Sequence, residues 1–240
     1  MRWLRPDRNA AGSRSGGKVT MRAMRWIFGG LTLAATAMCG AAELSVHVVD
    51  DHGKPVADAV VTVLQDGTAS GQPSKGVHAP TTRFIDQKSL TFIPYIEVFR
   101  PGDSVVFRNS DKTRHHVYSF SPIKTFEFML VPGQSSPPLL LDKNGVIAVG
   151  CNIHDQMITY MVVSDAPWIA QSTANGQVAF HDLPAGAYSI HVWQPRLRPG
   201  TRDVVQSTAL GGANASQSLA FKLSLLPDSR SDMDREHMSY

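Results

Sequence analysis

Cys151-Asn152-Ile153-His154-Asp155-Gln156-Met157 is the stretch of sequence that decides the fold of this chain. It places a thiol, an imidazole and a thioether at steps of three residues. Soft metals such as copper favour these donors, and a trigonal set of two His and one Cys with a weak axial Met defines an electron-transfer copper site. The stretch therefore supplies three of four donors, and a second imidazole must come from elsewhere in the chain.

The second imidazole is best supplied by the pair His115-His116. This pair follows residues 105–109, a β-branched run that predicts a strand and ends in the turn residues Asn109-Ser110-Asp111. A donor at the start of the next strand can reach a loop on a neighbouring strand. Spacing alone leaves open whether His115 or His116 is the donor.

Together these features resemble the cupredoxins, the blue copper proteins, and the Cys-x-x-His-x-x-Met spacing resembles the amicyanin-like members. In that family the first ligand lies six residues after a strand-ending Asn and two before a Val, which corresponds here to Asn109, His115 and Val117. The resemblance implies a Greek-key β-sandwich that carries single electrons between redox partner proteins and is not an enzyme. It also implies one type 1 copper, cycling between Cu(I) and Cu(II), with the ligands His115, Cys151, His154 and Met157.

Two positions depart from the cupredoxin pattern. The family usually has Asn where this chain has His116, so we expect this imidazole to support the site from outside the ligand set. Relatives often have aromatic residues in alternation before the Cys, whereas this chain has Ile147, Val149 and Gly150. An aromatic electron path along this strand is therefore not expected.

Short apolar runs separated by turn residues continue through residues 84–164, the predicted cupredoxin domain. Many short strands with regular turns indicate an all-β sandwich. The predicted strands are residues 90–93, 96–99, 104–108, 116–120, 125–131, 139–141, 146–149 and 159–163.

Residues on either side of this domain resemble the two halves of a carboxypeptidase-regulatory-like domain, which is a transthyretin-like β-sandwich. The first half carries Asp-x-x-Gly-x-Pro-x-x-x-Ala-x-Val at residues 50–61, and the second half covers residues 173–192. Neither half would bury its apolar face alone. We therefore predict one discontinuous sandwich of residues 43–68 and 169–226, with the cupredoxin domain inserted between its strands. Within the first half, residues 44–49 and 56–64 predict a hairpin.

The first 42 residues have the pattern of an export signal. Arg22 and Arg25 precede an apolar run at residues 26–38, which is too short to span a membrane, and small residues end at Ala42. We predict cleavage after Ala42 and a periplasmic location. A start at Met21 or Met24, and a lipid anchor on Cys39, are the alternatives at this end. Residues 227–240 predict a flexible tail.

Removing this leader changes what charge and cysteine content imply. The leader holds 7 of the 23 basic residues and 1 of the 20 acidic ones, so the +3 net charge of the full chain becomes negative. A basic surface for nucleic acid is thereby excluded. Cys151 becomes the lone cysteine of an exported protein, where a thiol is either reactive or bound to metal.

Other functions compete with electron transfer by copper. A zinc site of His115, Cys151 and His154 is chemically possible, although the soft thioether of Met157 favours copper. A cysteine that only packs in a core is a third interpretation. The alternatives to an electron carrier are a copper-binding module for storage or delivery, and a structural or adhesive protein with a vestigial site. Oligomeric state is not predicted.

Overall fold

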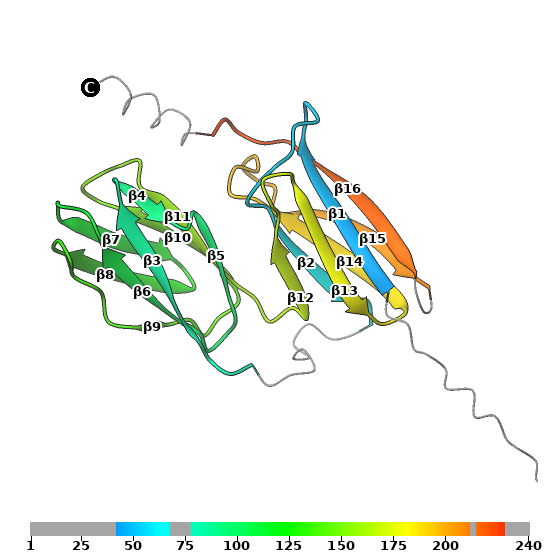
Figure 1. The fold of residues 1–240 in the computed structure, drawn as a ribbon, viewed down its shortest axis with the longest axis horizontal. Coiled ribbons are helices and arrows are strands. Elements are labelled where there is room, and N and C mark those ends of the chain that lie inside the picture. The colour runs from blue at the N-terminus through cyan, green and yellow to red at the C-terminus, as the bar shows by residue number, and fades with distance from the viewer. Residues whose placement is uncertain (1–41, 68–77, 212–214, 229–240) are drawn as a thin grey trace, which may run out of the picture. The chain divides into compact units, whose positions relative to one another are not determined.

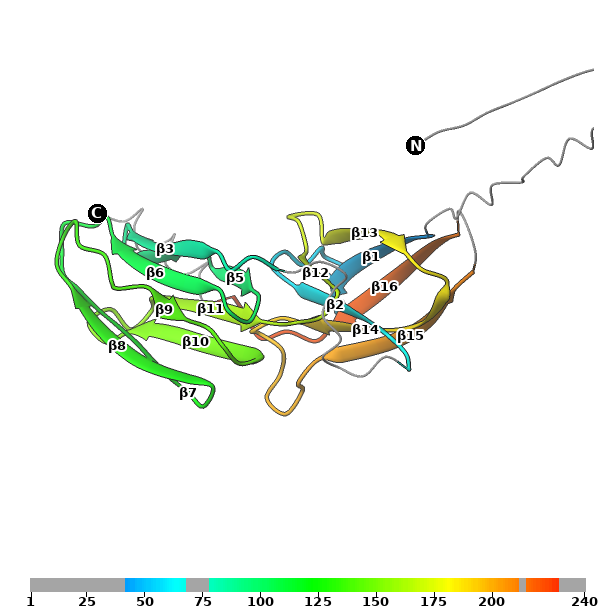
Figure 2. The ribbon, with the colours of Figure 1, turned by 90° about the horizontal axis from the view of Figure 1, so that it is seen from below.

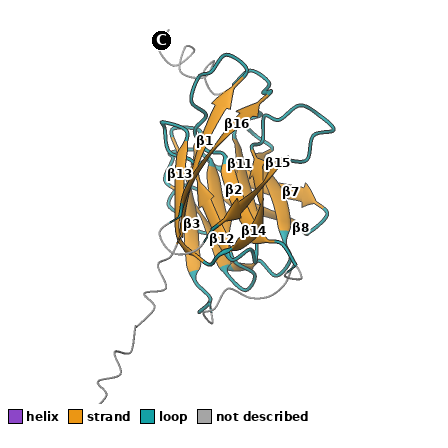
Figure 3. Ribbon diagram, turned by 90° about the vertical axis from the view of Figure 1, so that its right-hand side faces the viewer, coloured by secondary structure: helices purple, strands orange, loops and turns teal. Residues whose placement is uncertain are grey.

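The computed structural model describes residues 42–67, 78–211 and 215–228. These residues form strands, turns and loops, coloured in Figure 3, and the prediction of an all-β chain is confirmed. The predicted signal peptide up to residue 41, Cys39 and the tail beyond residue 228 lie outside the described residues. Among the described residues there is no helix of the length and apolarity that crossing a membrane requires.

Residues 82–163 form two sheets. One contains β3 (Thr82–Lys88), β4 (Thr91–Ile93), β6 (Ser104–Asn109) and β9 (Leu139–Leu140) in the order β4-β3-β6-β9. The other contains β5 (Ile96–Phe99), β7 (His115–Ser121), β8 (Lys124–Leu130), β10 (Gly145–Cys151) and β11 (Ile158–Val163) in the order β5-β11-β10-β7-β8 (Figure 1). Figure 2 shows β3 and β6 of the first sheet above β7, β8 and β10 of the second. Apolar side chains from both sheets form one core.

Strand alternation decides which side chains of β7 and β10 enter this core. Successive side chains of a strand point to opposite faces of the sheet. In β10 the buried positions are Ile147, Val149 and Cys151. In β7 they begin with His115 and Val117, so that His116 lies on the outer face.

The strand β3 is missing from the sequence prediction. Its sequence Thr-Arg-Phe-Ile-Asp-Gln-Lys places only Ile85 and Gln87 in the interior. Gln87 is polar but fully buried, and its side-chain amide donates to the carbonyl of Arg108 at 2.9 Å. A buried amide breaks the hydrophobic alternation on which strand prediction depends. The strand forms because it pairs in parallel with β6.

The remaining strands form two further sheets around a second core. One has the order β13-β1-β16, from β13 (Gln177–Leu183), β1 (Ala42–Asp50) and β16 (Ser216–Leu223). The other has the order β12-β2-β14-β15, from β12 (Trp168–Gln171), β2 (Val60–Gln65), β14 (Gly186–Trp193) and β15 (Val204–Leu210). β2 therefore pairs with strands that follow it by more than 100 residues in the sequence. The carboxypeptidase-regulatory-like assignment of these sheets stays a prediction.

The predicted hairpin of residues 44–49 and 56–64 is wrong. β1 and β2 lie in different sheets, and β1 pairs in parallel with β16 instead. Both strands carry apolar side chains that enter the same core, from Leu44 in β1 to Val63 in β2. Two strands that face one another across a core cannot also be hydrogen-bonded neighbours. The local sequence does not show which of these two arrangements a pair of strands adopts, because the pairing partner of β1 lies far away in the chain.

Gly176, in the turn between β12 and β13, is expected to be sensitive to substitution. Its φ is +70°, and a Cβ there would lie 2.3 Å from the carbonyl oxygen of Val48. We expect Gly176→Ala to lower the free energy of unfolding by about 1–3 kcal/mol through backbone strain alone, with the steric conflict adding to this. Urea unfolding monitored by circular dichroism measures the loss.

Gly53 provides the matched control for Gly176. Its φ is +78°, but nothing lies within 4 Å of a Cβ built there. Gly53→Ala therefore contains the backbone strain without the steric conflict. If Gly176→Ala and Gly53→Ala lose the same stability, the steric conflict with Val48 in β1 does not contribute to the loss at Gly176.

Candidate metal centre

Cys151 is the last residue of β10, and a tight loop follows it. The thiol side chain is buried, with 3 % of the residue exposed. The Cys151 N–H donates to the carbonyl of Met157 at 3.2 Å, and the Met157 N–H donates to the carbonyl of His154 at 3.0 Å. These bonds fold the six residues between β10 and β11 back on themselves, so that His154 and Met157 return to the end of the strand that carries the thiol.

His115 is the first residue of β7, the strand beside β10, and it is fully buried. Val117, two residues further on, is paired with Cys151 across the two strands. The loop before His115 is shaped by Asn109, whose side-chain amide donates to the carbonyls of Thr113 and Leu130, both at 2.9 Å. Asn109 is itself buried. The turn residues that end β6 therefore set where β7 begins and where its first imidazole points.

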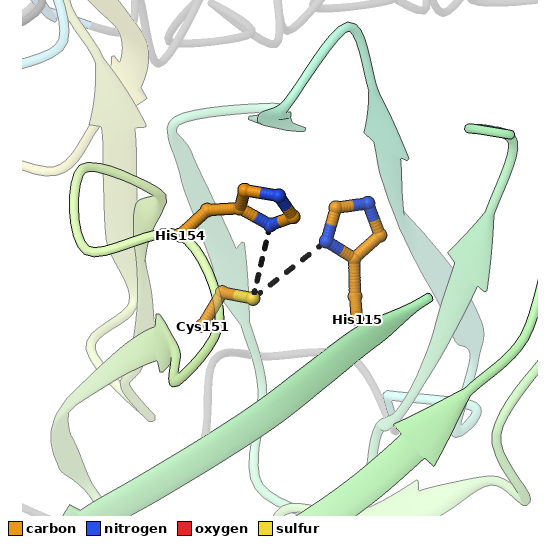
Figure 4. Close-up of side chains that lie close together, drawn as sticks. All are labelled: His115, Cys151 and His154. Atoms are coloured by element: carbon orange, nitrogen blue, oxygen red, sulfur yellow. Dashed lines mark hydrogen bonds between the residues drawn. The ribbon is translucent and has the colours of Figure 1, made fainter. Parts of the chain in front are cut away.

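Three of the four predicted donors meet at one point (Figure 4). The Sγ atom of Cys151 lies 3.6 Å from Nδ1 of His115 and 3.9 Å from Nδ1 of His154. The donor atoms of all three residues lie within 4.8 Å of one another. Within the described ranges this is the group of His, Cys, Asp and Glu side chains whose spacing suits a metal ion.

The spacing of these donors agrees with metal binding. An ion at about 2.3 Å from a thiolate sulphur and about 2.0 Å from an imidazole nitrogen holds the two atoms about 3.5–3.7 Å apart at bond angles of about 109–120°. The distance to His115 falls in this range, and the distance to His154 is slightly longer. A single thiolate with two imidazoles is also a donor set that copper accepts. The residues present therefore fit a soft metal without rearrangement of the sheet.

Met157 and His154 differ in their exposure to solvent. Met157 is buried, with 2 % exposed, in the same core cluster as Cys151. His154 is only partly buried, and it lines an open groove of about 610 Å³ together with Lys88, Leu90 and other residues of the neighbouring loops. One imidazole of the cluster thus reaches the surface. The role of Met157 as an axial ligand stays a prediction.

His116 lies outside the cluster, on the opposite face of β7. Its Nε2 lies 3.4 Å from a carboxylate oxygen of Glu127. Its carbonyl accepts a hydrogen bond from the N–H of Asn152 at 3.0 Å, and its Nδ1 lies 3.5 Å from the side-chain amide of Asn152. Asn152, in the loop after Cys151, is therefore connected to His116 in β7 through both its backbone and its side chain. Of the two imidazoles that spacing left open, His115 is the one beside the thiol.

Two further residues at the site were not predicted from the sequence. The ring of Tyr118 in β7 covers Gly150, and a Cβ on Gly150 would lie 3.2 Å from the tyrosine oxygen. The aromatic neighbour of the thiol strand thus comes from the adjacent strand, which no pattern along β10 could reveal. Asp111 contacts the outer nitrogen of His115 at 3.0 Å. Its only sequence signal is its place four residues before His115 in the turn that ends β6.

Comparison with known proteins gives matches at the level of structure. No family model matches the sequence, and no curated protein matches it. The solved structures that are similar to this chain include a purple cupredoxin from Nitrosopumilus maritimus, with 19 % identity over 34 % of this chain and 98 % of that chain and a TM-score of 0.31. A reduced amicyanin variant shows 16 % identity over 43 % of this chain and 99 % of that chain, with a TM-score of 0.32.

A copper-containing nitrite reductase from Thermus scotoductus is also similar. It shows 21 % identity over 40 % of this chain, with a TM-score of 0.30, and only 27 % of the reductase is covered. Cupredoxins and a copper enzyme are thus among the structural neighbours, and each of these matches leaves more than half of this chain unmatched.

Proposed function

We propose that this chain is an exported type 1 copper protein of the periplasm, which carries single electrons between redox partner proteins. The observation that supports it is the convergence of one buried thiol and two imidazoles at 3.6 and 3.9 Å. The ligands would be His115, Cys151, His154 and Met157. Copper bound there supplies a one-electron couple between Cu(I) and Cu(II).

Copper is favoured over zinc by the surroundings of the thiol. Met157 is buried at the end of the loop that carries His154, and its carbonyl accepts a hydrogen bond from the N–H of Cys151. A thioether is a soft ligand that suits copper, whereas zinc sites use thiolate, imidazole and carboxylate. In the described residues Cys151 is the sole cysteine, and it is not in a disulfide. Its burial limits the access of oxidants to the sulphur in an exported protein, where a free thiol is otherwise reactive.

The site suits electron transfer because its donors are fixed and one of them is accessible. Cys151 and His115 stand on adjacent, hydrogen-bonded strands, so the sheet holds both donors in place while the charge of the site changes. His154 lines the open groove, and it is the imidazole through which an electron can enter or leave. Cys151 and His115 are buried, so a substrate has no direct approach to them. We therefore propose a carrier and not an enzyme.

Titration of the full-length exported protein with Cu(II) tests this proposal. We expect one ion bound per chain and an intense visible band from thiolate-to-copper charge transfer. A colourless complex would refute the type 1 site. Reversible voltammetry with copper retained against a chelator supports the carrier. Rapid transfer of the copper to the chelator would instead support storage or delivery of the ion.

Met157→Leu is expected to change the reduction potential and leave the fold intact. The two side chains have similar volume, so the free energy of unfolding should fall by less than about 1.5 kcal/mol. Loss of an axial donor weakens Cu(II) more than Cu(I), and the potential of a blue-copper site depends on this ligand. We expect the visible band to remain and the potential to rise, measured by redox titration. An unchanged potential would remove Met157 from the ligand set.

Met161 serves as the control for this substitution. It is fully buried in the same core as Met157 but belongs to β11, outside the donor loop. Met161→Leu is therefore expected to leave the potential unchanged. A shift of equal size in both variants would point to a general change in core packing.

A further inference from the structure

Asp111 places a carboxylate directly behind the buried imidazole of His115. Its Oδ2 lies 3.0 Å from Nε2 of His115, and the two side chains are 13 % and 0 % exposed. The other ring nitrogen, Nδ1, faces the Sγ atom of Cys151 at 3.6 Å. A neutral imidazole carries one N–H and one lone pair. Since a carboxylate accepts hydrogen bonds, the proton belongs on Nε2, and the lone pair on Nδ1 points into the donor cluster.

Asp111 is itself held by backbone groups from another part of the sandwich. Its Oδ1 accepts from the N–H of Ser89 at 2.6 Å, and its Oδ2 accepts from the N–H of Leu90 at 3.0 Å. Ser89 and Leu90 form the turn between β3 and β4, and both have positive φ, 54° and 56°. The N–H of Asp111 donates to Oδ1 of Asn109 at 3.0 Å. The carboxylate is therefore anchored from both sides and cannot swing away from His115 without breaking these bonds.

We propose that Asp111 is a positioning residue of the metal centre, which holds His115 with Nδ1 free for copper and uses its negative charge to favour Cu(II). The inference rests on the proposed copper function. A hydrogen-bonded partner behind a ligating His fixes the tautomer and increases the electron donation of the ring. The negative charge of Asp111 stabilises Cu(II) more than Cu(I), because the attraction between opposite charges grows with the charge of the ion.

Glu127 offers a matched control for Asp111. It places a carboxylate oxygen 3.4 Å from Nε2 of His116, the adjacent imidazole that lies outside the donor cluster. The side chain of Glu127 is 74 % exposed to solvent. Glu127→Gln therefore removes a carboxylate–imidazole contact between β7 and β8 without touching His115.

The first measurement uses the metal-free, full-length exported chain. Long-range ¹H–¹⁵N correlation spectra report which ring nitrogen of a histidine carries the proton. For the wild-type chain we expect the tautomer of His115 that carries its proton on Nε2. We expect Asp111→Asn to shift or broaden this pattern and Glu127→Gln to leave it unchanged. A wild-type His115 with its proton on Nδ1 would overturn the proposal, and this result needs neither copper nor a variant.

The second measurement uses the copper-loaded chain. Loss of an outer partner of a metal-binding His lowers metal affinity about 10–100-fold. We expect Asp111→Asn to lower the affinity for Cu(II) by a factor in this range. If the loss for Cu(II) exceeds that for Cu(I) tenfold, the reduction potential rises by about 59 mV. Equal potentials in Asp111→Asn and Glu127→Gln would overturn the electronic role. Absence of the visible band in the wild type would refute the copper function itself, while the tautomer result would still decide the positioning role.

Discussion

Cys151→Ser is expected to abolish the intense visible band of the copper-loaded protein. The band requires charge transfer from a thiolate to Cu(II), and a serine hydroxyl is neither ionised at neutral pH nor a soft donor. The substitution also leaves two imidazoles as the main donors, so the affinity for copper should fall. Absorption spectroscopy and competition with a chelator of known affinity measure the two effects.

The fold should tolerate this substitution. Serine is close to cysteine in size, and burying its hydroxyl at this position costs about 1–3 kcal/mol. His116→Asn is the matched control, because His116 is adjacent to His115 in sequence but lies on the opposite face of β7. We expect His116→Asn to keep the band. A band that survives in Cys151→Ser, or disappears in His116→Asn, would assign the site to other donors.

Asp103→Ala is expected to destabilise the fold more than any other single change that we predict. Asp103 lies in the turn between β5 and β6 and is fully buried. Its carboxylate accepts from the N–H of Thr81 at 2.7 Å, the hydroxyl of Thr81 at 2.9 Å and the N–H of Arg100 at 2.8 Å, and it contacts Nε2 of His78 at 2.7 Å. Removing it leaves partly buried N–H groups of Thr81 and Arg100 without this partner, and we expect a loss of about 2–5 kcal/mol in urea unfolding.

The loss of stability caused by Asp103→Ala should depend on pH. Burial opposes the charged form, but hydrogen bonds from the backbone of Arg100 and Thr81, and from the side chains of His78 and Thr81, outweigh it and lower the pKa of Asp103 from 3.8 to about 2. A lowered pKa in the folded state contributes stability above the ordinary pKa, and this contribution is lost as pH falls from about 4 to about 2. About 2 kcal/mol of the wild-type stability should disappear in this window, and Asp103→Ala should lack this loss.

Asp142 provides the control for Asp103. Its side chain is 53 % exposed and lies 3.7 Å from Lys124. Exposed ion pairs contribute about 0–1 kcal/mol, so Asp142→Ala should change little at any pH. If the two variants lose the same stability, the buried carboxylate does not anchor the turn between β5 and β6.

Much of the candidate site could be predicted from local sequence. Cys151, His154 and Met157 lie in one short loop, where spacing and donor chemistry are readable without a structure. Spacing predicts that the second imidazole comes from His115 or His116, and the resemblance to the cupredoxins implies His115. In the structure His115 lies beside the thiol and His116 lies on the opposite face of the sheet, while ligation of a metal by His115 stays a prediction.

Other features of the site depend on contacts between distant strands. Asp111 lies in the turn before β7 and contacts His115. Its carboxylate is held by the N–H groups of Ser89 and Leu90 in the turn between β3 and β4. Tyr118 covers Gly150 because β7 and β10 are neighbours. The cover of Gly150 by Tyr118 and the anchoring of Asp111 by Ser89 and Leu90 each join segments that are far apart in the sequence, so no pattern within one segment predicts them.

The same division holds for the fold. The sequence by itself determined that the chain is all-β, and it located most strands, because turn residues and apolar alternation act within a few residues of one another. Only the tertiary structure decided that β1 pairs with β16 and not with β2, and that the polar segment of β3 is a strand. Strand partners are chosen by the burial of both faces against segments that the local sequence does not contain. For the candidate metal centre, the sequence by itself predicted the candidate donors, and the packing of the strands decided which imidazole faces the thiol and which carboxylate stands behind it.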